Sequence, residues 1–242
     1  MFEEELMLRK QLLGGLVVLT AVVASSSAFA ATVTPTFTDE GIDTTGTATE
    51  TRMYRADLTG LGITEVGAIT VNDSNSGIGG SSGIYSGFDL DAIFLDVDGS
   101  LATSDDRFFA SSFLYSAGTA RGGGSPVSPS GGPMNGASSA TTVDEAWATL
   151  GSIDGIFFGT GSITLGDGGS LTAIFDPTIA IGSSLFLFAG EVSGDAGETL
   201  TGLVEIADTP PTMTPVPLPA GLPLMLSGLL GIGLLARRKK TN

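Results

Sequence analysis

Glycine-rich turns divide residues 31–208 into short runs, and this spacing constrains the fold more than any other feature of the sequence. The clearest turn sequences lie at residues 159–161, 166–169 and 193–197. The runs between turns are rich in Thr, Val, Ile and Phe, which favour strands. Apolar residues often occupy every second position, as at Leu171, Ala173 and Phe175, so that one strand face enters a core and the other meets solvent.

We therefore predict an all-β fold, specifically an antiparallel β-sandwich, of which the jelly roll is one form. The expected strands are residues 32–38, 47–57, 66–72, 88–97, 107–115, 153–158, 162–165, 170–176, 184–189 and 199–206.

Two segments depart from this pattern. Thr142 and Glu145 have the spacing of a capping box, and Gly151 stands where a helix would end, so residues 142–151 predict one short helix. Its Trp147 has two readings: a ring packed on the sheets, or a platform on which a sugar stacks. Residues 117–141 are rich in Gly, Ser and Pro and predict a flexible loop within the 31–208 domain.

The first 30 residues have the pattern of a secretory signal peptide. Arg9 and Lys10 precede an apolar run, and Ala28-Phe29-Ala30 supplies an A-x-A cleavage site, so we expect cleavage after Ala30. The alternative is a buried N-terminal helix. Three acidic residues upstream of the basic pair are unusual for such a leader, which leaves both Met1 and Met7 open as translation starts.

The other end predicts a membrane anchor. Residues 218–236 carry no charge, and as a helix they would extend about 28 Å, close to the thickness of a bilayer core. The basic residues that follow favour a cytoplasmic tail at 237–242, which places the preceding domain outside the cell. Residues 209–217 are Pro-rich and predict an extended stalk. The topology-setting residues are Arg237, Arg238, Lys239 and Lys240.

This C-terminal region resembles the VPLPA variant of the PEP-CTERM sorting signal of exported bacterial proteins. The motif consists of Val216, Pro217, Leu218, Pro219 and Ala220, followed by the apolar helix and the basic cluster. The resemblance implies recognition by an exosortase, a membrane-embedded cysteine transpeptidase that would cleave near the motif and move the protein to the cell surface or extracellular matrix. It covers about 25 residues and implies nothing about the fold or ligand of residues 31–208.

Charge and missing residue types exclude several functions. Three of the 26 acids and six of the ten bases lie in the terminal segments, so residues 31–215 carry 23 acids, four arginines and a net charge of −19. Such a field repels nucleic acid. The chain has no Cys or His, which excludes thiolate nucleophiles, imidazole bases and Cys/His zinc sites. We therefore expect no enzyme, although a carboxylate-based glycosidase would need only a buried acid pair.

Acidic residues are densest between Asp89 and Asp106. On a regular strand Asp89 and Asp91 would face opposite to Asp96 and Asp98, so one metal could not bind all four unless a bulge intervened. The spacing does not match an EF-hand. The candidate Ca²⁺ ligands are Asp96, Asp98, Asp105 and Asp106; the alternative is a solubilising strand edge followed by an Asp-Gly turn.

We thus expect an exported, membrane-anchored and then surface-sorted protein with a structural or adhesive role in a biofilm or exopolysaccharide matrix. The alternative is a lectin-like module that binds carbohydrate or calcium. Apart from Ca²⁺ in that alternative, no cofactor is expected. The expected partners are the exosortase, the membrane before processing, and a polysaccharide.

Overall fold

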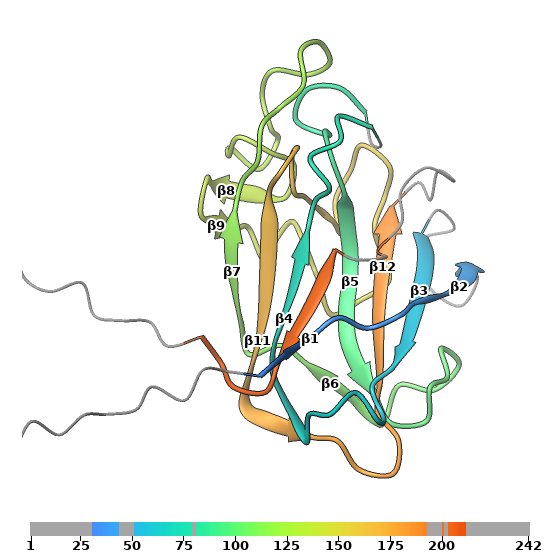
Figure 1. The fold of residues 1–242 in the computed structure, drawn as a ribbon. Coiled ribbons are helices and arrows are strands. Elements are labelled where there is room, and N and C mark those ends of the chain that lie inside the picture. The colour runs from blue at the N-terminus through green and yellow to red at the C-terminus, as the bar shows by residue number, and fades with distance from the viewer. Residues whose placement is uncertain (1–30, 44–50, 79–80, 193–199, 201–202, 212–242) are drawn as a thin grey trace, which may run out of the picture.

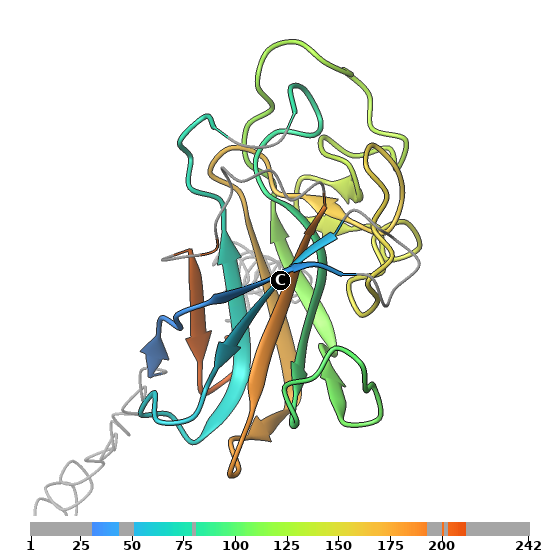
Figure 2. The ribbon, with the colours of Figure 1, turned by 90° about the vertical axis from the view of Figure 1, so that its right-hand side faces the viewer.

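The computed structural model describes residues 31–43, 51–78, 81–192, 200 and 203–211, and these residues form an all-β, antiparallel structure. Two sheets lie against each other, as Figures 1 and 2 show from perpendicular directions. The first has the order β1 (Thr32–Val33), β13 (Val204–Ala207), β4 (Glu65–Asn72), β11 (Ser170–Ala180) and β7 (Ser112–Ser116). The second has the order β10 (Ile163–Thr164), β5 (Asp89–Asp96), β12 (Phe186–Val192), β3 (Thr51–Asp57) and β2 (Thr38–Ile42), with β6 (Arg107–Phe109) also paired to β5. Strands β8 (Ala137–Ser139) and β9 (Thr142–Val143) form a small separate hairpin.

The chain alternates between the sheets. Strands β3, β5 and β12 belong to the second sheet, whereas β4, β11 and β13 belong to the first. Apart from the consecutive pairs β2–β3 and β5–β6, neighbouring strands within each sheet are therefore distant in sequence, and loops cross from one sheet to the other at both ends.

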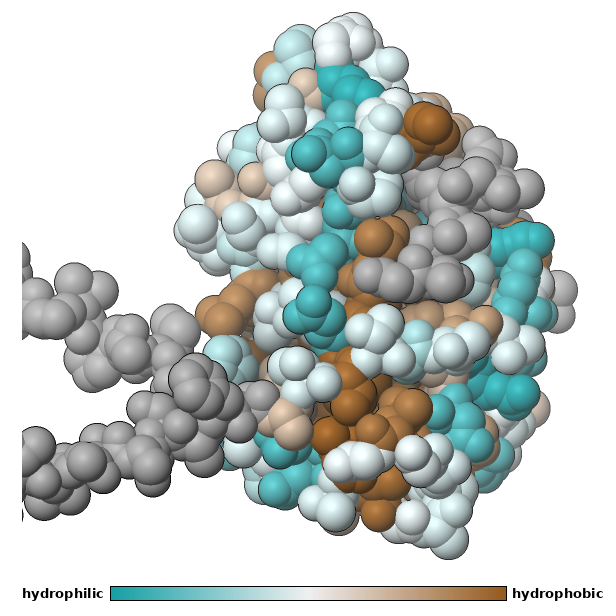
Figure 3. Space-filling model, in the orientation of Figure 1, coloured by the Kyte–Doolittle hydropathy of each residue, from teal (hydrophilic) through white to brown (hydrophobic). Residues whose placement is uncertain are grey.

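The main core lies between the sheets. Alternate side chains of β4 and β11 meet those of β5 and β12, and a fully buried Leu, Ile or Phe contributes about 1.5–3 kcal/mol. The central buried residues include Ile69, Val71, Leu171, Ala173, Phe175, Ile93, Leu95 and Leu187. On one face of the molecule, shown in Figure 3, polar residues are spread widely and apolar side chains gather in the lower half of the view.

A second, smaller cluster covers the outer face of the second sheet. Phe94 of β5 stacks on Phe188 of β12 with ring centroids 5.3 Å apart, and Met53 of β3 joins them. Ile153 packs on this cluster from a covering loop. Strand β5 is therefore buried along its whole length, which fits the uninterrupted apolar run from Ala92 to Leu95 in its sequence.

Most expected strands are present, but the strand expected at residues 153–158 is wrong. This segment is a loop whose backbone bonds close locally, with Gly159 N–H donating to Ile156 O and Ile156 N–H to Thr160 O. Glycines within and beside it permit these turns. The strands expected at 32–38 and 107–115 are also interrupted, the first between β1 and β2 and the second between β6 and β7.

The expected helix at 142–151 is wrong as well. Thr142 and Val143 form β9, and only one turn follows, in which Trp147 and Ala148 N–H groups donate to Asp144 O. Asp144 itself caps this turn by accepting Ala146 N–H at 3.2 Å. Helix formation is unfavourable in its first turn and depends on length. Here tertiary pairing ends it early, because Leu150 O accepts the N–H of Ile93.

The segment 117–141, expected to be a flexible loop, makes specific contacts. Met134, Asn135 and Ala137 are buried, and Ala117 N–H donates to Ala140 O. Its flexibility stays a prediction, but it packs against the body of the domain.

The predicted signal peptide (1–30), sorting helix (218–236) and basic tail (237–242) lie outside the described residues, as does most of the stalk. Within the described part of the chain, no helix is long and apolar enough to cross a membrane.

Candidate cation site and neighbouring pocket

Three acidic side chains meet where β5 leads into β6. Asp96 ends β5, Asp98 follows it in the turn, and Asp106 precedes β6. One carboxylate oxygen from each lies within 4.8 Å of the others. Asp105, the fourth expected ligand, is exposed and is not part of this group.

The local turn fixes the first two carboxylates. Asp96 Oδ1 accepts Gly99 N–H at 2.6 Å, and Asp98 Oδ1 accepts Ser100 N–H at 2.8 Å. Gly99 has a φ of +70°, and a Cβ there would lie 2.9 Å from the ring of Phe186. Glycine is therefore required both by the left-handed backbone and by close packing.

Arg107 neutralises part of the charge. Its Nε lies 3.6 Å from Asp96 Oδ2, its Nη2 donates to Leu101 O at 2.9 Å, and its guanidinium lies 4.5 Å from the centre of the Phe94 ring. Three carboxylates facing one guanidinium leave a formal excess of two negative charges. In addition, Asp96 Oδ2 and Asp106 Oδ1 are buried and accept no hydrogen bond.

The pKa values of the neighbouring carboxyls of Asp96 and Asp98 are shifted in opposite directions. Burial raises the pKa of Asp96, and the carboxyl of Asp98 and the charge of Asp106 raise it further. The hydroxyl of Thr103 lowers the pKa of Asp98, helped by Ser100 N–H. A divalent cation bound among the three carboxylates would offset their mutual repulsion. Three carboxylates supply only part of the six to eight oxygens that Ca²⁺ prefers, so waters or carbonyls would have to complete the shell.

The other two acids of the run lie outside this group. The pairing of β5 with β12 skips one residue between Ala92 and Leu90, which leaves Asp91 at a bulge. Asp91 accepts the hydroxyl of Thr51 at 2.5 Å and the N–H of Asp154 at 3.3 Å. Asp89 accepts the hydroxyl of Thr164. The six acids of the run thus divide into a three-carboxylate cluster, two acids hydrogen-bonded elsewhere and the exposed Asp105.

A pocket of about 430 Å³ borders the cluster. The turn from Leu101 to Ser104 and residues 151–153 line it, together with Arg107 and the 50% exposed Phe109. Thr103 belongs to both features, because its hydroxyl donates to Asp98 Oδ2 at 2.8 Å. Arg107 also belongs to both, because it lines the pocket and its Nε lies 3.6 Å from Asp96 Oδ2. A change at the cluster would therefore reach the pocket through these two side chains.

No protein family, curated protein or solved structure matches this chain. The site must accordingly be interpreted from its own chemistry.

The indole of Trp147 is held by hydrogen bonds within the protein. Its indole N–H donates to Asn135 Oδ1 at 3.0 Å and to Gly159 O at 3.2 Å, and the side chain is only partly exposed. These bonds hold the loop of residues 156–160 in place. They favour the packing interpretation over the sugar platform.

Sequence reasoning missed the exposed rings on that loop. Phe157 and Phe158 are 40% and 51% exposed with centroids 3.9 Å apart, and Phe158 has a φ of +58°, which is strained for a bulky residue. Tyr85 packs edge-on against Phe158 at 4.7 Å and donates its hydroxyl to Phe158 O. The signal was three consecutive apolar residues between Gly155 and Gly159 without strand alternation.

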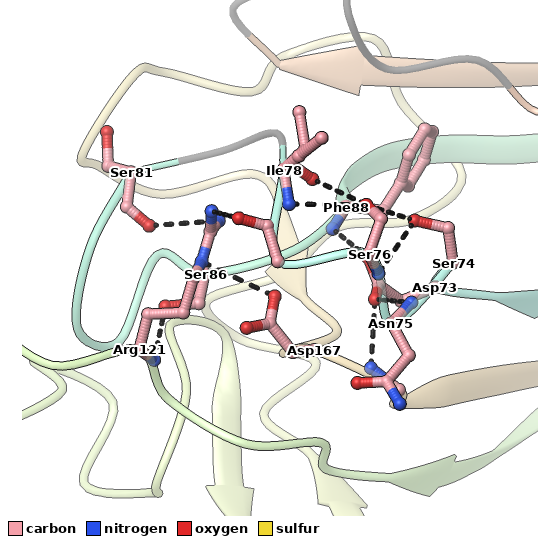
Figure 4. A network of polar contacts seen from close by, with 12 residues as sticks. Asp73, Ser74, Asn75, Ser76, Ile78, Ser81, Ser86, Phe88, Arg121 and Asp167 are labelled. Carbon is pink, nitrogen blue, oxygen red and sulfur yellow. Dashed lines mark hydrogen bonds and ion pairs between the residues drawn. The ribbon is translucent and has the colours of Figure 1, made fainter.

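A separate polar network fixes the loops that join the sheets (Figure 4). The carboxylate of Asp73 accepts the N–H groups of Asn75, Phe88 and Gly168, while Arg121 Nε lies 3.4 Å from Asp167 Oδ1. All of these contacts are made within the protein, so we interpret the network as structural.

Proposed function

We propose that this chain is an exported bacterial protein that is sorted to the cell surface and serves as a structural or adhesive component of a biofilm or exopolysaccharide matrix. The observation that carries the proposal is the ordered sequence of Val216–Ala220, the uncharged apolar segment and the basic cluster, together with the A-x-A site at the other end. An exosortase-type transpeptidase is the processing partner, and the C-terminal helix holds the protein in the membrane until then.

The arrangement of the domain supports this topology. Thr32 pairs with Ala207, so the chain enters and leaves the described domain on adjacent strands. Two terminal segments that both address a membrane can then do so from one corner without crossing the domain.

We also propose that the two sheets form a β-sandwich of the jelly-roll type. If β2, β6 and β7 are treated as additions and the β8–β9 hairpin as an insertion, eight strands remain in the orders β1-β13-β4-β11 and β3-β12-β5-β10. These are the first, eighth, third and sixth strands facing the second, seventh, fourth and fifth, which is the order produced by two Greek keys. Such a scaffold suits binding or assembly, and the absence of His and Cys supports a role without catalysis.

The intact mass of the chain isolated from the surface of its producing cell tests the sorting. We expect a protein that begins at Ala31 and ends before the basic cluster. A mass that retains Arg237 to Lys240 in the surface-exposed form would mean a permanent anchor and would contradict processing by a transpeptidase. A protein found only in the cytosol would overturn export itself.

The lectin-like alternative rests on a different observation, the cluster of Asp96, Asp98 and Asp106 beside a pocket with an exposed aromatic ring. In this candidate function Ca²⁺ binds the carboxylates and stiffens the wall that Thr103 joins to Asp98. The half-exposed Phe109 then offers a face on which a neutral sugar can stack.

Thermal unfolding with millimolar Ca²⁺ or with a chelator tests this candidate. A ligand that binds only the native state raises Tm. At a concentration a hundred times its Kd, it increases the free energy of unfolding by about 2.7 kcal/mol. We expect Asp98→Asn to abolish the Ca²⁺-dependent rise and the matched variant Asp105→Asn to keep it. Equal Tm values with Ca²⁺ and with chelator in the unaltered chain would reject the site.

A further inference from the structure

The two ends of the domain meet in a reciprocal pair of hydrogen bonds. Ala31 N–H donates to Asp208 Oδ1 at 3.1 Å, and Asp208 N–H donates to Ala31 O at 3.2 Å. These bonds extend the pairing of β1 with β13 by one step beyond Thr32 and Ala207. Ala31 is also the residue that the A-x-A sequence predicts as the first of the mature chain.

We propose that removal of the signal peptide creates an ion pair between the new N-terminal ammonium of Ala31 and the carboxylate of Asp208, so that processing itself locks the N-terminal strand to the exit of the domain. The inference rests on the proposed export. Hydrolysis of the Ala30–Ala31 bond consumes one water and leaves a carboxylate on Ala30 and an ammonium on Ala31. A neutral amide donor is thereby replaced by a cation at the same carboxylate, which makes the hydrogen bond charge-assisted.

Charge distribution favours this pair. Residues 31–215 contain four arginines and no lysine, and every arginine already lies within ion-pair distance of another acid. The pairs are Arg52–Asp39, Arg55–Glu40, Arg107–Asp96 and Arg121–Asp167, with distances between 3.1 and 3.6 Å. The mature N-terminus therefore adds a fifth cation to a strongly anionic domain, at the position of an acid that none of these arginines pairs with.

The residues that follow Asp208 also pack at this corner, against β4. A Cβ at Gly67 of β4 would lie 2.5 Å from the carbonyl carbon of Thr209 and 2.6 Å from Pro210 N. The residues after β13 thus lie directly against the β4 backbone. Locking Ala31 to Asp208 would fix the first residue of the mature chain at the point where the predicted stalk begins.

The test is the pKa of the Ala31 amino group in the chain exported with its own leader and purified in detergent. The N-terminus is first read by mass, and amine acylation is then followed between pH 6 and 10. An α-amino group ordinarily has a pKa near 8, and we expect the Asp208 pair to raise it by roughly half a pH unit. Asp208→Asn should remove that rise.

Glu205→Gln is the matched control, because it removes the same charge from β13 three residues earlier. Glu205 and, one strand further, Glu65 of β4 are the other titratable groups on the strands packed there. The ion pair contributes stability below the ordinary amino pKa and loses it as pH rises through the raised value, so Tm between pH 7 and 9.5 should fall more steeply in the unaltered chain than in Asp208→Asn.

Acylation midpoints that coincide in the unaltered chain and Asp208→Asn would overturn the lock while leaving export intact. An equal lowering of the amino pKa in Glu205→Gln would show that the shift comes from the overall negative charge and not from a specific pair, and would also overturn the lock. A mature N-terminus at another residue would contradict the cleavage site in the proposed function, and the inference with it.

Discussion

At Asp91 the backbone of β5 carries an extra residue, and the carboxyl is enclosed by Thr51 and the backbone of Asp154. Burial raises the pKa of Asp91 from 3.8 to about 6, against the lowering effect of the Thr51 hydroxyl. The sequence located the acids of this region but could not show which are buried, because a one-residue bulge changes the face on which each side chain lies. Asp91 and Asp96 are both fully buried, whereas Asp89 keeps a small exposed fraction.

The raised pKa of Asp91 predicts that the protein loses stability with rising pH. Below about pH 4 both folded and unfolded states hold the proton. Between pH 4 and 6 the unfolded state releases it more readily, so the free energy of unfolding falls and stays lower above pH 6. A pKa difference of this size corresponds to roughly 3 kcal/mol. Asp91→Asn should therefore be more stable than the unaltered chain at pH 7.5, by about 1–2 kcal/mol after partial loss of its hydrogen bonds.

Urea unfolding at pH 4.5 and 7.5 checks this expectation, with Asp105→Asn as the exposed control. If Asp91→Asn is the less stable protein at pH 7.5, the carboxylate is stabilised by its partners more than burial penalises it.

At the scale of elements, local sequence predicted strands well where alternation or apolar runs were long, as in β4, β5 and β11. It failed at the covering loop of residues 149–160, because Ile153 to Phe158 has strand composition but lies across a sheet instead of within one. The capping box at Thr142 wrongly predicted a helix for a similar reason. In the structure the backbone of Thr142 and Val143 pairs with β8 instead of forming the hydrogen bonds of a helix. Three of the four expected cation ligands lie in the cluster, since the Asp-Gly turn brings Asp96 and Asp98 together locally.

The covering loop depends on the absence of a side chain at Gly155. A Cβ there would lie 2.4 Å from Val192 Cγ2 and 2.7 Å from Asp91 Cγ. We expect Gly155→Ala to destabilise the protein by about 1–3 kcal/mol through overpacking. Gly182→Ala is the matched change, because no atom lies within 4 Å of its Cβ position, and it should be neutral or slightly stabilising.

Denaturant midpoints of the two variants distinguish local packing from a general intolerance of alanine. Equal midpoints would show that the loop can move away from β12 at little cost.

For the whole molecule, turn spacing and apolar alternation predicted an all-β class and the charge count a strongly anionic domain, whereas the strand order could not be predicted. Alternation identifies the buried face of each strand but carries no information on which strand lies beside it. The chain alternates between the sheets because loops cross at both ends. Those loops are mainly Gly, Ser and Asp, and their sequence does not indicate which strand will pair with which.

The net charge of −19 in residues 31–215 predicts that monovalent salt stabilises the fold. Repulsion between carboxylates opposes the compact state, and raising NaCl from about 0.05 to 0.5 M shortens the screening length from over 10 Å to under 5 Å. We expect Tm to rise by several degrees over this range in the presence of chelator. A Tm that falls with salt would mean that the four arginine ion pairs outweigh the repulsion.

The position of β13 bears on how such a domain carries mechanical load. This strand is the last before the chain leaves the domain, it is bonded to β1 on one side and β4 on the other, and the loops of the Asp73 network lie toward its opposite end. A pull between a tether at residue 208 and an object gripped by those distant loops would run nearly parallel to the strands. Both ladders of β13 would then be sheared at once instead of being unzipped one bond at a time, an arrangement suited to resisting tension.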